Sequence, residues 1–113
     1  MYTLTAHFSE DQNGWNRARL DEHMTQVHIL LRSIGAEANK CAFEYTPIGF
    51  SAHARFAPTM NDWASRSDGN KLVMANNALY AFLALLKSDN VAVVSVEIEY
   101  TDSEGRKRGI FYR

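Results

Sequence analysis

The stretch Ala6-His7-Phe8, followed by Asn13-Gly14-Trp15, decides the fold because it occurs twice in this sequence. It returns as Ala54-Arg55-Phe56 and Asn61-Asp62-Trp63, and every match is displaced by 48 positions. A coherent displacement of several separate matches predicts two similar structural units, each built from the same elements in the same order.

A second set of matches lies further along the chain and is displaced by 55 positions. Leu30-Leu31-Arg32-Ser33 returns as Leu85-Leu86-Lys87-Ser88, and Glu44-Tyr45-Thr46 returns as Glu99-Tyr100-Thr101. The second unit is therefore seven residues longer than the first, which is the difference between the displacements of 55 and 48. Each unit is expected to contain a strand, a turn that carries a tryptophan, a helix and a second strand.

Hydrophobic periodicity places these elements. Alternation of apolar and polar residues indicates strands, and apolar residues at three- and four-residue steps indicate helices. The expected strands cover residues 2–8, 40–46, 50–57, 91–101 and 106–113, and the expected helices cover about 17–34 and 70–87. Trp15 and Trp63 are expected to fill the corner between strand and helix in their own halves.

Two interleaved strand–helix–strand units predict a ferredoxin-like arrangement, an α+β fold of βαββαβ order with an internal pseudo-twofold axis. Residues 1–113 are expected to form a single α+β domain. Two helices should cover one face of an antiparallel sheet, with strands 2–8 and 50–57 side by side in its centre. Residues 106–113 should form an added C-terminal edge strand beside residues 91–101.

Composition narrows the classes of function. The chain has 113 residues and a formal net charge of −1, so no overall field attracts nucleic acid or an anionic membrane, and neither is expected as a partner. Met1-Tyr2-Thr3 begins a segment that has no basic, apolar signal-peptide pattern. Cys41 is the only cysteine, which excludes an internal disulfide and is typical of a reducing, cytoplasmic setting. No motif predicts a cofactor or a metal site.

The sheet face without helices is the expected place for a functional site. His7 and His53 lie on the two central strands and point to this face, so they are the candidate catalytic residues. Glu44 or Glu97 could stand beside them as a carboxylate partner. The candidate binding residues are Glu44, Arg55, Glu97 and Tyr112.

A charged hairpin is expected near the C-terminus. If its turn centres near Ser103–Glu104, Arg106 and Arg108 lie on the same face as Glu97 and Glu99 and form cross-strand ion pairs with them. The same hairpin is expected to turn Phe111 inward. Val93, Ile110 and Tyr112 are then expected to form an apolar corner on the otherwise polar face.

Three known families share features with this sequence. Gly49-Phe50-Ser51 resembles the start of a strand in the RNA-recognition motif, but Ala52 stands where that motif has an aromatic residue. The length and the repeat are similar to those of the tautomerase family, whose mechanism needs an N-terminal proline where this chain has Tyr2. Size and strand order are also similar to those of dimeric α/β-barrel monooxygenases and lyases.

Two functions remain. The first is a small binding module that acts through protein contacts, either as a homo-oligomer (a dimer) or with another protein, and uses the sheet face or the edge strand. The alternative is a cofactor-free enzyme for a small molecule, of isomerase, lyase or monooxygenase type, with a site on the open sheet face of a dimer. In that case His7 and His53 move protons and Glu44 or Arg55 orients the substrate.

Overall fold

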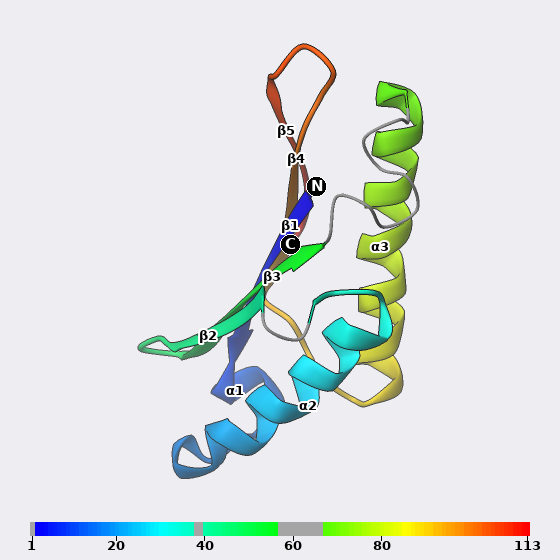
Figure 1. Cartoon of the computed structure of the whole chain (residues 1–113). Coiled ribbons are helices and arrows are strands. Elements are labelled where there is room, and N and C mark those ends of the chain that lie inside the picture. The colour runs from blue at the N-terminus through cyan, green and yellow to red at the C-terminus, as the bar shows by residue number, and fades with distance from the viewer. Residues whose placement is uncertain (1, 38–39, 57–66) are drawn as a thin grey trace.

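The computed structural model in Figure 1 describes residues 2–37, 40–56 and 67–113. Trp63 and its expected corner position lie outside the described residues. The elements, in chain order, are β1 (Tyr2–Ser9), α1 (Glu10–Asn13), the 3-10 turn η1 (Arg17–Arg19), α2 (Leu20–Ser33), β2 (Cys41–Tyr45), β3 (Gly49–Phe56), α3 (Asp68–Ser88), β4 (Ser95–Thr101) and β5 (Lys107–Tyr112).

The five strands form one open antiparallel sheet in the order β2-β3-β1-β4-β5. This confirms the predicted α+β class and antiparallel sheet. β1 and β3 are neighbours, and β5 extends the sheet beside β4, both as predicted from the sequence. The two long helices, α2 and α3, lie on the same side of the sheet (Figure 1).

The register of the central strands follows the sequence repeat. Thr5 of β1 pairs with His53 of β3, which is the residue 48 positions later. The pair of Leu4 with Ala54 is likewise matched by the pair of Ala6 with Ala52. If the β1 residue of one pair is moved 48 positions forward and its β3 partner 48 positions back, the other pair results.

One layer of side chains between the sheet and the two helices forms the core. The strands contribute their alternate residues, and α2 and α3 contribute the apolar face that each turns toward the sheet. The largest fully buried side chains are those of Phe8, Phe50, Phe56, Phe82, Leu4, Leu20, Leu31, Leu86, Ile98, Val27 and Val96. The opposite sheet face is left without a covering element in the described part of the chain.

The connection after β1 is organised by three polar or small residues. The Ser9 hydroxyl accepts a hydrogen bond from the Gln12 amide and caps α1, and Gly14 closes the helix with a left-handed φ of 66°. The Asn13 amide side chain then bonds in both directions to the backbone of Ala92, at 2.7 and 2.8 Å. This link holds the segment before β4 against α1.

Trp15 follows this turn and fills the corner that the sequence predicted for it. Its ring stacks on His23 of α2, with ring centroids 4.1 Å apart, and on Phe50 of β3, with centroids 5.6 Å apart. Trp15 therefore joins α2 to the sheet by packing.

The β4–β5 hairpin turns on Asp102, whose side chain is only 2% exposed. Its carboxylate accepts hydrogen bonds from the amides of Glu104 and Arg106 and from the Arg108 guanidinium. These donors hold the pKa of Asp102 below its ordinary value, and the Arg106 amide is the largest cause. Gly105 completes the turn at a φ of 80°.

The turn connects the strands differently from the prediction. The pairing of Tyr100 with Arg108 and of Thr101 with Lys107 centres the turn on Glu104. The observed turn includes one more residue than the predicted turn, which was centred between Ser103 and Glu104. A shift of one residue moves every side chain of a strand to the other face.

Three expectations for this hairpin are therefore wrong. Arg108 lies across from Tyr100 on the helix side of the sheet, and Arg106 and Arg108 pair with Asp102 rather than with the glutamates of β4. Phe111 pairs with Glu97 on the helix-free face instead of pointing inward. Tyr112 pairs with Val96, so the apolar corner lies on the helix side.

Candidate interaction surface

The helix-free face of the sheet presents the two histidines that the sequence singled out. His7 Nδ1 lies 2.7 Å from the Ser51 hydroxyl, and His53 Nδ1 lies 3.3 Å from the Thr5 hydroxyl. Both partners are the directly opposite residues on the neighbouring strand. Each imidazole is therefore held by a cross-strand hydrogen bond to a hydroxyl group.

The carboxylates expected beside these histidines lie at diagonal positions on the neighbouring strands. Glu44 pairs with Ser51 and is diagonal to His53, and Glu97 pairs with Thr5 and is diagonal to His7. Diagonal neighbours of this kind lie roughly 7–8 Å apart. The register thus sets the four residues in a zigzag row across β2, β3, β1 and β4, with none directly opposite another.

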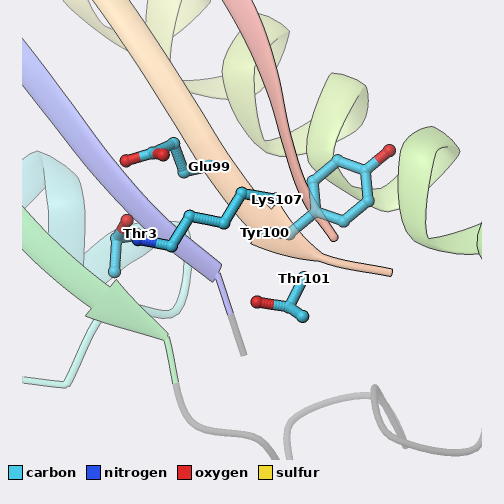
Figure 2. A pocket seen from close by; sticks show the side chains of 5 residues that line it. All are labelled: Thr3, Glu99, Tyr100, Thr101 and Lys107. Carbon is cyan, nitrogen blue, oxygen red and sulfur yellow. The ribbon is translucent and has the colours of Figure 1, made fainter. Parts of the chain in front are cut away.

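A shallow hollow lies at one end of the helix-free face. Its volume is about 190 Å³, and its lining comes from β1, β4 and β5. Figure 2 shows Thr3, Glu99 and Lys107 gathered on one side of the strands, whereas the ring of Tyr100 points toward α3. Arg55 pairs with Thr3 on the adjoining strand, so this candidate binding residue borders the hollow.

The outer strand β5 carries two exposed aromatic side chains, Phe111 and Tyr112. Phe111 is 58% exposed and Tyr112 is 44% exposed. The Arg113 guanidinium carbon lies 5.6 Å from the centroid of the Phe111 ring, within the range of a cation–π contact. The two aromatic rings project to opposite faces of the same edge strand.

Tyr112 also borders a larger hollow on the helix side. This hollow has a volume of about 520 Å³ and is lined by the end of α3 and the segment that leads to β4. Its apolar lining includes Leu83, Val91 and Val93. The predicted association of Val93 with Tyr112 therefore exists, but on the side opposite to the one expected.

The backbone of β5 has hydrogen-bonding groups on its outer edge. The Asp102 amide donates to the Arg106 carbonyl over 2.8 Å, which defines a hydrogen-bonded pair at the turn. In an antiparallel ladder such pairs alternate, so Arg108, Ile110 and Tyr112 direct their amides and carbonyls to β4. Lys107, Gly109 and Phe111 direct theirs away from the sheet.

Lys107 as a surface residue and the exposed position of Phe111 were not predicted from the sequence. The signal for both was the spacing of Asp102 and Gly105. An acidic residue followed three positions later by glycine is typical of a type I turn with a left-handed fourth residue, which makes a three-residue hairpin loop. That loop sets the observed register.

Residues 2–37, 40–56 and 67–113 also bear on metal sites, reactive thiols and membrane spans. Within these ranges, no three His, Cys, Asp or Glu side chains are grouped so that they could hold a metal ion. Burial raises the pKa of the Cys41 thiol, whose Sγ donates to the Glu37 carbonyl over 3.3 Å. None of the helices described in these ranges has both the length and the apolar character that a membrane span requires.

Comparison of the chain with models of protein families, with curated protein sequences and with solved structures finds no match.

Proposed function

We propose that this protein is a small binding module that acts through contacts with another protein chain. The observation that carries this proposal is the β5 edge strand, on which two adjacent aromatic side chains are exposed on opposite faces. Tyrosine and other aromatic residues are enriched at protein interfaces, where they contribute large contact areas. An unpaired strand edge beside them offers backbone hydrogen bonds to the same partner.

The geometry around the histidines supports this function over an enzyme. His7 and His53 each bond to a hydroxyl on an open sheet, and four hollows on the described surface are lined by other residues. A proton-transfer site needs a substrate held within hydrogen-bond reach of its base. The proposed roles of His7 and His53 as proton shuttles therefore have less support than the β5 surface.

We assign the fold to the ferredoxin-like arrangement with a fifth strand added at one edge. The order β2-β3-β1-β4 and the register that follows the repeat support this assignment and the internal pseudo-twofold axis. A cytoplasmic location accords with Cys41, a lone free thiol.

Affinity capture from the cells that produce this protein tests the proposal. The double variant Phe111→Ser/Tyr112→Ser should lose at least one partner that the native chain captures. The matched control is Tyr45→Ser/Ile48→Ser, which removes two exposed apolar side chains at the other end of the sheet and should retain that partner. An identical set of captured proteins for all three chains, together with a monomeric native chain in sedimentation, would contradict the proposed function.

A further inference from the structure

We propose that β5 accepts an acidic, extended segment of a partner protein as a sixth strand of the sheet. This inference rests on the proposed function and names the chemistry of the partner. It is carried by three features of the residues that face outward from β5: their backbone groups, their charges and the spacing of their side chains.

The backbone groups require a partner in extended conformation. Lys107, Gly109 and Phe111 direct their amides and carbonyls to the outer edge, as the alternation from the Asp102–Arg106 hydrogen bond shows. Gly109 is exposed and has no side chain that would hinder the approach of another backbone. These groups match the ladder of an added strand.

The charges of β5 select an acidic partner. The segment from Lys107 to Arg113 contains three cationic residues and no acidic residue. Arg108 is occupied by the buried carboxylate of Asp102. Among the described residues, Lys107 and Arg113 form no salt bridge. Arg113 lies over the Phe111 ring, so each of the two cations can still pair with a carboxylate of a partner.

The same charges disfavour a second copy of the chain in the register centred on Ile110. Antiparallel pairing of two β5 strands about Ile110 would place Lys107 of one copy opposite Arg113 of the other. Like charges in directly opposite positions destabilise a strand pair.

Spacing defines the partner more closely. Lys107, Gly109, Phe111 and Arg113 alternate along the helix-free face, and the Phe111 ring lies beside Gly109, so an added strand meets a cation, an aromatic surface and a second cation in turn. The complementary strand has acidic residues six positions apart, with two apolar residues between them on the same face. Both apolar side chains pack against the surface that the Phe111 ring forms beside Gly109.

A synthetic peptide provides the test, namely acetyl-Asp-Thr-Val-Thr-Val-Thr-Asp-amide. Its sequence is the same in both directions, so it presents both acidic groups whether it pairs parallel or antiparallel to β5. The control peptide has lysine in place of both aspartates. Titration of the isotope-labelled protein, followed by NMR, should shift the amide signals of Lys107, Gly109 and Phe111 with a Kd below about 1 mM. Binding of the control should be at least tenfold weaker.

Two variants locate the interaction. Gly109→Pro removes an outward amide and should abolish binding, whereas the matched variant Gly109→Ala retains the amide and should bind more tightly than the proline variant. If the proline variant does not fold, Lys107→Glu/Arg113→Glu replaces it. This double variant should reverse the preference between the two peptides.

Four results would overturn the inference. They are equal binding of both peptides, shifts confined to other parts of the sheet, tighter binding of a single-stranded oligouridine than of the acidic peptide, and a native dimer that Gly109→Pro converts to a monomer. If the peptide fails while Phe111→Ser/Tyr112→Ser still loses its captured partner, only this inference is wrong. If neither experiment gives the expected result, the proposed function is wrong as well.

Discussion

The two outer strands of the sheet are held in different ways. Beside β2, the Tyr45 hydroxyl donates to Asp21 of α2, and Arg17 donates to the Thr46 carbonyl over 2.7 Å. The ring of His28 from α2 meets the ring of Phe43 edge to face at 5.8 Å. These contacts bind the edge of the first half to the layer of helices.

β5 is anchored mainly through its turn. Asp68, the first residue of α3, accepts hydrogen bonds from the Ser103 amide at 2.9 Å and from its hydroxyl at 2.8 Å. Asp102 holds the turn from inside. Like β2, which pairs with β3 alone, β5 pairs with a single strand, β4, and it exposes Phe111 and Tyr112. Since an unprotected strand edge recruits other chains, the difference indicates which edge is available for a partner.

The largest expected difference in stability is between alanine substitutions at two glycines, one near each edge of the sheet. A Cβ on Gly49, where β3 turns back from β2, would lie 2.1 Å from the Phe8 carbonyl oxygen. Since this oxygen belongs to packed backbone that cannot move aside freely, Gly49→Ala should lower the free energy of unfolding by about 3 kcal/mol. Urea unfolding followed by circular dichroism measures it.

Gly109→Ala is the matched control on β5. Its Cβ would lie 3.6 Å from ring carbons of Phe111, an ordinary contact. Stability should stay the same or rise by up to about 1 kcal/mol, since glycine weakens a strand interior. Equal losses at the two positions would contradict the described packing of the β2–β3 turn.

Acid should weaken the hydrogen bonds of Asp68 and Asp102 that anchor the turn before β5. The bonds from Ser103 lower the pKa of Asp68, and those centred on Arg106 lower the pKa of Asp102. Both carboxylates therefore contribute stability above the ordinary pKa of an aspartate, about 3.9, and this contribution is lost as the pH falls through their lower folded values. Thermal melts between pH 7 and pH 2 should show a falling midpoint.

Asp102→Asn sharpens this test. The asparagine oxygen can still accept hydrogen bonds from the Glu104 and Arg106 amides, but the side chain carries no charge at any pH. The variant should therefore be less stable at neutral pH, and its thermal midpoint should fall less steeply between pH 7 and pH 2. An unchanged slope for both Asp102→Asn and Asp68→Asn would show that other groups cause the acid sensitivity.

The smallest effect on stability is expected at exposed apolar residues. Phe111→Ser on β5 and Ile48→Ser in the β2–β3 turn each change a side chain that is more than half exposed, so the free energy of unfolding should change by no more than about 0.5 kcal/mol. Paired unfolding curves measure this. A loss several times larger for Phe111→Ser would mean that its ring is part of the core and that its exposure does not explain binding.

The sequence was informative where local rules and global packing agree. Alternation predicted that Leu4, Ala6 and Phe8 are buried and that His7 faces away from the helices, because one face of the sheet must be covered. The repeat predicted that β1 and β3 are neighbours. Whether His7 and His53 act in catalysis stays a prediction.

The C-terminal hairpin was less predictable, because its register depends on one residue of the turn. The bonds that centre the turn on Glu104 come from Asp102, which is buried in the fold but looks like a surface charge in the sequence. The exposure of Phe111 and the loss of the expected pairing between Glu99 and Arg108 both follow from this local choice.

The hairpin register is also the claim on which the β5 surface depends, and cross-strand NMR contacts measure it most directly. The α-hydrogens of facing residues approach each other closely in non-hydrogen-bonded antiparallel pairs. We expect cross-peaks between the α-hydrogens of Glu97 and Phe111, of Glu99 and Gly109, and of Thr101 and Lys107. Cross-peaks of Glu97 with Ile110 and of Glu99 with Arg108 would instead place Phe111 toward the helices and contradict the account.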